Sequence, residues 1–421
     1  MNLSLSTPIL APDPALPQRD LLLNETVMKE YLSRLVARKG AFSIDDCERL
    51  RTKYRVGASL RVLYEITGNG RSYRIAARAY PRTRHMTNKF NSRCEIHAAE
   101  LKTRFWIFPH DRKIKQLSLL NEIPEELREI AGRAWTKSRI VGHAPEKSVT
   151  AQCLAQDNKL LAYAKIYAGA EGQNFFNIYA HVARQSQSER LKLPRALSYS
   201  EKHQLLLLEA VPGVSLSELA TARRGKAFYQ LGKALRELHA TAPPSSLPPS
   251  TRFTPEALTR TAGTISEARP DVAAVVQRLT GKLLAQHDLH GAGERVFLHG
   301  DVHAKNLLLA GERLCLLDLD QAAIGVAGVD LGSVIAGLHC DACTGSLSWR
   351  DASSLIHAFL AGYGPFNTCE TLESLRWHVA AALLHERALR AVTRIRTRVL
   401  QKLPQLLRFA EAVLDGGIGE N

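Results

Sequence analysis

The sequence predicts an α+β protein in which a small antiparallel sheet precedes a mainly helical region, with a further α+β domain at the N-terminus. Two pairs of alternating apolar segments predict the sheets, LRVLYEI with SYRIAARAY and SVTAQCL with LLAYAKIY. Apolar residues recur at intervals of three and four from Asp351 to Leu414, which predicts helices there. A chain of 421 residues has room for about two or three domains.

The composition divides the chain into four segments. Residues 1–23 are rich in Pro and Leu but lack periodicity, so we expect a poorly ordered arm. Residues 24–137 should form the N-terminal domain, 138–212 the sheet lobe with its connection, and 213–421 the helical lobe.

The N-terminal domain is expected to begin with helices. Asn24 can cap a helix that ends at Gly40, and a second short helix, SIDDCERLRTKY, is predicted from Ser43. The strand pair that follows resembles the second pair, so that Arg78 corresponds to Lys165. Two interpretations stay open: the domain is a degenerate copy of the sheet lobe, or two basic hairpins are alike by chance.

The chain is basic, with a formal net charge of +15 at pH 7. From Arg71 to Arg93 there are several basic residues and no acidic one, interleaved with apolar residues at strand spacing. Few aromatic residues accompany them, so a solvated or anion-facing strand is favoured over a nucleic-acid site. The strand could recruit an anionic substrate or cover the edge of a sheet.

The sequence shows neither a membrane span nor a signal peptide. No apolar run approaches the roughly 18 residues that a spanning helix needs. The N-terminus lacks the basic start and apolar stretch of a secretory signal. A cytoplasmic protein is therefore expected.

The segment from Val296 to Asp318, VFLHGDVHAKNLLLAGERLCLLD, places polar residues where short apolar strands end. Asp301 and Asn306 share one loop, and Asp318 closes the strand after the next hairpin. Their oxygen atoms suit Mg²⁺. Phosphoryl transfer needs one Asp to orient the attacking hydroxyl and accept its proton, and an Asn and a second Asp on the metal ions.

These residues carry a resemblance to a known family. HGDVHAKN, followed by LLDLD and then VDLG, resembles the catalytic and metal-binding segments of the aminoglycoside phosphotransferase and choline kinase family, relatives of the protein kinases. The resemblance implies a two-lobed protein-kinase-like fold with Asp301 as catalytic base and Asn306 and Asp318 as metal ligands. It also implies that His303 donates to the transferred phosphoryl group and that Asp330 accepts backbone donors of the catalytic loop.

The resemblance further implies an ATP site. Lys165 would bind the α- and β-phosphates, and the loop HAPEKS before it would cover them. Because this loop is not rich in glycine, Lys147 or Ser148 would contact the phosphates directly. The strand LLLL would lead into a hinge at Glu209 to Val211, whose backbone binds adenine.

The predicted function is ATP- and Mg²⁺-dependent phosphorylation of a hydroxyl on a small molecule, such as a sugar, an amino alcohol or a related metabolite. The alternative is a pseudokinase or nucleotide-binding module, because the helix after Lys165 has a Glu only at its start, Glu171. A protein kinase is disfavoured, since the chain has no Asp-Phe-Gly or Ala-Pro-Glu segment. An aminoglycoside acceptor is not expected, because polycations need an acidic site.

Overall fold

The computed structural model describes residues 9–37, 43–84, 95–130, 134–185, 191–291, 293–311, 313–365 and 369–416. The chain forms two compact units. Unit 1 comprises residues 1–173, 197–208 and 392–395, and unit 2 comprises the rest. The predicted N-terminal domain and most of the sheet lobe therefore share one unit.

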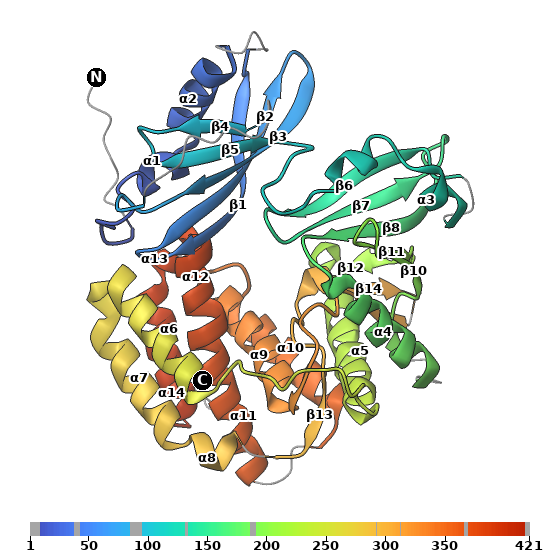
Figure 1. Ribbon diagram of the computed structural model, residues 1–421. Helices are drawn as coiled ribbons and strands as arrows, with labels where there is room; N and C mark the ends of the chain where they lie inside the picture. Colours follow the sequence, from blue (N-terminus) through green and yellow to red (C-terminus); the bar gives the residue numbers. More distant parts are fainter. Residues whose placement is uncertain are drawn as a thin grey trace. The chain divides into compact units, whose positions relative to one another are not determined.

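The N-terminal domain contains a five-stranded antiparallel sheet with the order β1-β2-β3-β5-β4, accompanied by two helices (Figure 1). Buried and exposed residues alternate along much of the edge strand β1, as in a half-buried strand, whereas the neighbouring β2 is buried over most of its length. The elements are α1 (Arg19–Leu23), α2 (Glu25–Ala37), β1 (Asp46–Arg55), β2 (Ser59–Gly68), β3 (Arg71–Ala79), β4 (Glu95–Ala98) and β5 (Thr103–Ile107).

One of the two predicted N-terminal helices is present. Asn24 precedes α2, and its Oδ1 accepts the backbone N–H of Val27 at 3.1 Å, so the predicted cap is confirmed. The helix predicted from Ser43 is wrong, because this segment is β1. Cys47 and Tyr54 are buried on one face of the strand, and pairing with β2 over the whole length outweighs the local helix signals.

The prediction of a loose arm is also wrong for the described residues 9–23. Leu16 and Leu22 are fully buried. Arg19 is buried as well, and its guanidinium donates to the backbone oxygen of Ala11 at 2.8 Å and to the hydroxyl of Tyr54 at 3.3 Å. A buried arginine with these partners fixes the segment on the sheet.

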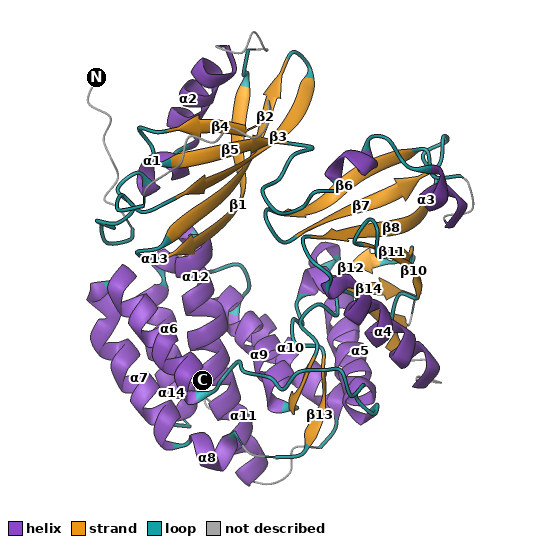
Figure 2. Ribbon diagram, viewed as in Figure 1, coloured by secondary structure: helices purple, strands orange, loops and turns teal. Residues whose placement is uncertain are grey.

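The second sheet repeats the strand order of the first. Its order from the meander edge is β6-β7-β8-β11-β10, which matches β1-β2-β3-β5-β4 strand for strand (Figure 2). We therefore favour the interpretation of the N-terminal domain as a degenerate copy of the sheet lobe over chance similarity of two hairpins. The strands are β6 (Lys137–Ala144), β7 (Ser148–Leu154), β8 (Leu160–Tyr167), β10 (Ala196–Ser200) and β11 (Leu205–Glu209).

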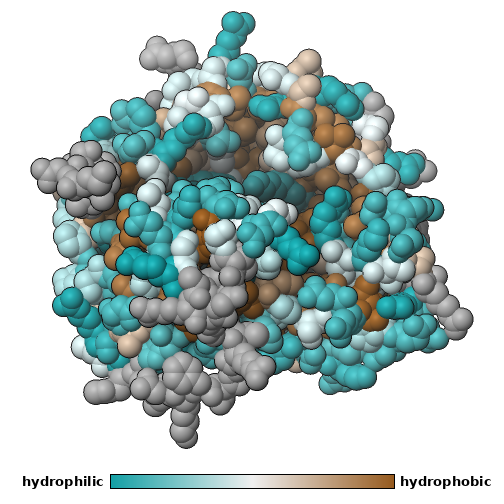
Figure 3. Space-filling model, turned by 90° about the horizontal axis from the view of Figure 1, so that it is seen from above, coloured by the Kyte–Doolittle hydropathy of each residue, from teal (hydrophilic) through white to brown (hydrophobic). Residues whose placement is uncertain are grey.

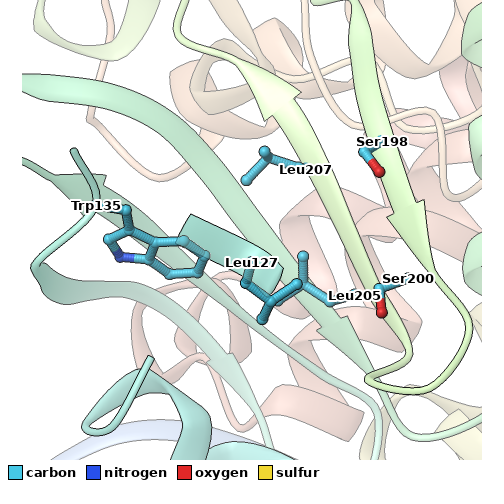
Figure 4. A pocket seen from close by; sticks show the side chains of 6 residues that line it. All are labelled: Leu127, Trp135, Ser198, Ser200, Leu205 and Leu207. Carbon is cyan, nitrogen blue, oxygen red and sulfur yellow. The ribbon is translucent and has the colours of Figure 1, made fainter. Parts of the chain in front are cut away.

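One face of this sheet is covered by the segment that leads into it. This segment includes a 3₁₀ turn at Leu117–Leu120 and α3 (Glu125–Ile130), and its leucines join a core with β7, β8 and β11. Trp135 is fully buried, and its indole N–H donates to the carbonyl of Lys137 at 3.0 Å. A small apolar pocket beside this indole is lined by Leu127, Trp135, Ser198, Ser200, Leu205 and Leu207 (Figure 4). No charged group lines it, so we assign it to core packing.

Unit 2 is mainly helical. Two long helices, α5 and α10, approach closely through glycines: a Cβ on Gly232 would lie 2.1 Å from the carbonyl oxygen of Phe359. The helices are α5 (Thr221–Ala240), α6 (Pro255–Ala268), α7 (Ala273–Ala285), α8 (His287–His290), α9 (Gly328–Cys343), α10 (Trp349–Tyr363), α11 (Cys369–Ala382), a π-helix (Leu383–Ala388), α12 (Leu389–Arg394), α13 (Thr397–Gln401) and α14 (Leu403–Leu414). Most of α4 (Glu171–Gln185) also belongs here.

Two small sheets in unit 2 position the polar segment that the sequence singles out. One has the order β12-β14-β15-β9, and the other pairs β13 with β16. Their strands are β9 (Leu191–Lys192), β12 (Val214–Ser215), β13 (Arg295–Leu298), β14 (Leu307–Ala310), β15 (Arg313–Leu316) and β16 (Ala323–Val326). The predicted α+β class is thus confirmed.

Hydrophilic residues prevail on the face shown in Figure 3, with hydrophobic residues gathered in recessed patches between them. Among the described residues, none of the helices has the length and apolar character that crossing a membrane requires.

Candidate active site

The loop between β13 and β14 carries Asp301 and begins with a turn that only glycine accommodates. Gly300 has φ +77°, and a Cβ there would lie 1.9 Å from the carbonyl oxygen of Gln321. Before it, the ring of His299 is buried, with Nε2 at 3.0 Å from the carbonyl oxygen of Leu317. Because a carbonyl only accepts, Nε2 donates, and Nδ1 accepts the N–H of Asp301 at 3.3 Å. Burial lowers the pKa of His299, which keeps this neutral tautomer.

Asp330, at the start of α9, fixes the same loop by accepting hydrogen bonds from its backbone. Its Oδ2 accepts the N–H of His299 at 2.7 Å, and its Oδ1 accepts the N–H of Gly300 at 2.9 Å. The carboxylate is fully buried and lies 3.3 Å from Nε2 of His239 on α5. Burial alone would raise the pKa of Asp330, but His239 and the backbone donors hold it below its usual value. The expected structural role of Asp330 is confirmed.

The β14–β15 hairpin places Asn306 beside Asp318. Leu307 pairs with Leu316, and the N–H of Leu317 donates to the carbonyl oxygen of Asn306 at 2.8 Å. Asp318 therefore follows directly the residue bonded to Asn306, and it adopts φ +67°, a conformation that Asp tolerates better than most residues. The side-chain amide of Asn306 donates to the backbone oxygen of Asp301 at 3.1 Å. Its Oδ1 is thus the atom left to meet a metal ion.

Asp301 lies between the side chains of His303 and Arg390. Nε2 of His303 is 3.6 Å from its Oδ2, and both Nη atoms of Arg390 are 3.4 Å from its Oδ1. Burial alone would raise the pKa of Asp301, but the neighbouring His303 side chain and the charge of Arg390 hold it well below its usual range. Asp301 is therefore ionised at neutral pH and able to accept a hydrogen bond from a hydroxyl group.

Arg390 belongs to a larger group of charges on the C-terminal helices. Glu386, in the π-helix, is buried and ion-paired with Arg252, and it accepts the hydroxyl of Ser333 at 2.6 Å. Arg387 donates to the backbone oxygen of Ser333, also at 2.6 Å. Such π-turns occur often at functional sites, and this one ends two residues before Arg390.

The predicted nucleotide residues divide between the units. Lys165 and Ser148 are buried in unit 1, with Lys165 opposite Thr150 in the β7–β8 ladder, and Lys147 is exposed on the loop before β7. Glu209 ends β11, and its carboxylate accepts the backbone N–H of Arg195 at 3.2 Å. Val211 follows it and is buried.

The side chains of Asn306 and Asp318 suit a magnesium ion whose remaining ligands are phosphate oxygens. Among the described residues, no group of three or more His, Cys, Asp or Glu side chains is placed to hold a metal ion. Mg²⁺ usually takes only one or two carboxylates from a protein and completes its shell with phosphate oxygens and water. One carboxylate and one amide at adjacent positions of a hairpin meet that need.

Sequence reasoning missed three residues of this site. His239 and Arg390 lie far from the motif in the chain, on helices whose patterns carry no catalytic signal. His299 stands inside the motif, and its position between a buried strand and Gly300 is the signal that could have found it.

Comparison with known proteins agrees with this geometry. The model of the phosphotransferase enzyme family, APH, matches residues 162–378. A probable bifunctional tRNA threonylcarbamoyladenosine biosynthesis protein of Methanosarcina barkeri is 38% identical over 96 residues. That match covers 22% of this chain and 15% of the relative, so the chain spans only a small part of that protein.

Two solved structures share the fold. One is a thermostable mutant of aminoglycoside phosphotransferase APH(4)-Ia in a ternary complex with ADP and hygromycin B, with a TM-score of 0.50 and 14% identity over 71% of this chain and 100% of that chain. The other is the AMP-bound spectinomycin phosphotransferase APH(9)-Ia, with a TM-score of 0.50 and 16% identity over 68% of this chain and 98% of that one. The family model covers more than half of the sequence, including the whole loop around Asp301. The chain belongs to the phosphotransferase enzyme family.

Proposed function

We propose that this protein transfers the γ-phosphoryl group of ATP to a hydroxyl group of a small molecule. The observation that carries the proposal is Asp301, ionised on a loop that Asp330 and His299 fix, with Asn306 and Asp318 beside each other on the next hairpin. The structural relatives contain adenine nucleotides, ADP in one and AMP in the other, which supports ATP as the donor.

Each residue has a distinct role in this proposal. Asp301 orients the acceptor hydroxyl and accepts its proton, and His303 and Arg390 keep it ionised and in place. Asn306 and Asp318 would hold Mg²⁺, which when bound neutralises charge on the phosphates. His303 is proposed to orient Asp301 rather than only to donate to the phosphoryl group, because its Nε2 already faces that carboxylate.

The donor nucleotide is assigned to the sheet lobe. Lys165 is proposed to bind the α- and β-phosphates, with Lys147 on the loop between β6 and β7 and Ser148 at the start of β7 contacting the phosphates directly. Backbone groups from Glu209 to Val211 are proposed to bind adenine. The N–H of Glu209 already donates to the carbonyl of Arg195 at 2.9 Å, so the adenine contacts fall to the other groups of this segment.

Replacing Asp318 by Ala is expected to weaken the binding of Mg²⁺-ATP, because the change removes a metal ligand. Titration calorimetry with ATP, with and without Mg²⁺, measures this directly. Asp320→Ala is the matched control, since Asp320 lies two residues further on and has no assigned role. If Mg²⁺ strengthens ATP binding equally in the Asp318→Ala variant and the wild type, the assignment of the metal site is wrong.

The acceptor is proposed to be neutral or anionic, not polycationic. Three arginines, Arg252, Arg387 and Arg390, lie at and around the catalytic base, where they pair with Glu386 and Asp301. A polycation would meet like charge here. A sugar or an anionic metabolite therefore fits better than an amino alcohol.

Kanamycin-type aminoglycosides at micromolar concentration are accordingly expected not to be phosphorylated efficiently, although two relatives of known structure act on antibiotics or bind them. ATP consumption can be compared across aminoglycosides, neutral sugars and hydroxy acids at the same concentration. If the aminoglycosides are phosphorylated efficiently and the sugars and hydroxy acids are not, the proposed acceptor class is wrong.

A further inference from the structure

The loop between β6 and β7 contains a tight turn in which Glu146 has an unfavourable backbone conformation. The N–H of Lys147 donates to the carbonyl oxygen of Ala144 at 2.9 Å, which closes a four-residue turn with Pro145 second and Glu146 third. Glu146 has φ +64°, the left-handed conformation that a type II turn requires at this place and that favours glycine or asparagine. A glutamate there is strained by its own Cβ, so other contacts must stabilise it.

Three arginines from the part of the chain before β6 bind the Glu146 side chain, of which only 4% is exposed. Arg112 binds it with two bonds, Nε to Oε1 at 2.8 Å and Nη2 to Oε2 at 3.0 Å. Arg78 on β3 contacts the same Oε2 through Nη1, and Arg61 on β2 does so at 3.3 Å. Arg61 also donates to the carbonyl oxygen of Pro145 at 3.2 Å. We call Glu146 with Arg61, Arg78 and Arg112 the arginine clamp.

The backbone of the turn is fixed from the same side. Oδ2 of Asp111 accepts the N–H of Glu146 at 2.9 Å, while its Oδ1 accepts the N–H groups of Lys113 and Ile114. Burial alone would raise the pKa of Glu146, but the three arginines lower it, so its carboxylate stays charged. Both the charge and the backbone of this residue are therefore bound by the segment before β6.

The turn also connects to the strand that carries Lys165. The carbonyl oxygen of Lys147 accepts the N–H of Ala168 at 2.9 Å, just beyond the end of β8. Moving Glu146 would thus move Lys147 and Ser148 relative to the end of that strand. From the sequence, two roles are open for the strand of Arg78: recruiting an anionic acceptor or covering a sheet edge. In the structure, the Arg78 side chain instead binds Glu146 in this turn.

We propose that the arginine clamp makes the N-terminal domain a working part of the nucleotide site: through Glu146, a positioning residue, it fixes the loop whose Lys147 and Ser148 meet the phosphates of ATP. This inference rests on the proposed function, because the phosphate contacts are themselves proposed. It also explains how a loop without a glycine-rich sequence has a defined shape. A flexible glycine loop is replaced by a strained turn that another domain fixes.

Binding of a non-hydrolysable ATP analogue with Mg²⁺, measured by titration calorimetry without acceptor, tests the clamp. The Kd is expected to rise about tenfold in Arg78→Ala and in Glu146→Gln, since each removes a charge-assisted bond. Arg74→Ala is the matched control: Arg74 lies on the same strand, is 21% exposed against 17% for Arg78, and pairs with Glu65 within its own sheet. Its Kd should equal that of the wild type.

Glu146→Gly separates the clamp from the backbone. Glycine adopts the positive φ without strain, so the backbone of the turn should not lower the melting temperature of this variant. Its affinity for the analogue should nevertheless drop as in Glu146→Gln. Arg112→Ala serves as the second variant if Arg78→Ala does not fold, because Arg112 is 36% exposed.

Wild-type affinity in the folded clamp variants would overturn the clamp while leaving the proposed function intact. A wild-type protein that fails to bind the analogue would overturn both the clamp and the proposed function.

Discussion

Replacing Asp301 by Asn is expected to lower turnover by roughly 100-fold or more, because loss of a positioned general base typically has that effect. Asn keeps the shape of the side chain but cannot accept a proton. ATP affinity should stay nearly unchanged, since Asp301 is assigned to the acceptor side and the metal ligands are Asn306 and Asp318. The Asn306 amide should also stay in place, because it binds the backbone oxygen of residue 301 and not its carboxylate.

Steady-state kinetics with a productive acceptor, together with calorimetry for ATP, gives both quantities. The melting temperature serves as the control for folding. Equal turnover in the variant and the wild type would remove Asp301 from the role of base. A wild type that binds ATP but shows no turnover with any acceptor would identify the protein as a nucleotide-binding module instead.

Replacing Asp330 by Ala is expected to destabilise unit 2 by about 3–5 kcal/mol, the usual effect of removing one partner from a buried charged network. The change leaves the N–H groups of His299 and Gly300 and the ring of His239 without their acceptor in the interior. Activity should fall as well, because the turn that presents Asp301 loses its support. Urea denaturation measures the loss of stability.

The matched control is Asp271→Ala. Asp271 is also ion-paired, with Arg269, but its side chain is 53% exposed, so its removal should change stability by less than about 1 kcal/mol. The pH dependence has a definite sign. Because the pKa of Asp330 is lowered in the folded state, its contribution is present above the unfolded pKa of about 3.9 and is lost as the pH falls through the folded value. Equal stability losses in the Asp330→Ala and Asp271→Ala variants would contradict this account.

Local spacing explains why the centre of the site was predictable. One stretch of loop and hairpin contains Asp301, Asn306 and Asp318. The order of its short strands and polar residues already predicts that these three residues lie close together. Arg390 contacts Asp301 from 89 residues away in sequence, and His239 contacts Asp330, which supports the loop, from 91 residues away. Only tertiary packing brings these residues together.

The same reasoning explains the two errors in the N-terminal domain. The segment after Ser43 has a cap-like start and many charged residues, yet its alternating buried residues pair with β2 along nine positions, and the ladder outweighs propensity. Arg19 reads as part of a polar arm, because no local pattern shows that a guanidinium will be buried against Tyr54. Glu146 is a similar case: the sequence shows a Pro-Glu turn, but its three arginine partners come from two strands and a loop.

The most direct test of the central claim is detection of the phosphorylated product. The wild type and the Asp301→Asn variant can be incubated with ATP, Mg²⁺ and a panel of neutral and anionic hydroxyl compounds, and the mixtures analysed by mass spectrometry. We expect at least one compound to gain a phosphoryl group on a hydroxyl with the wild type, at a rate roughly 100-fold or more above that of the variant. Product formed at the same rate by both proteins would contradict the account.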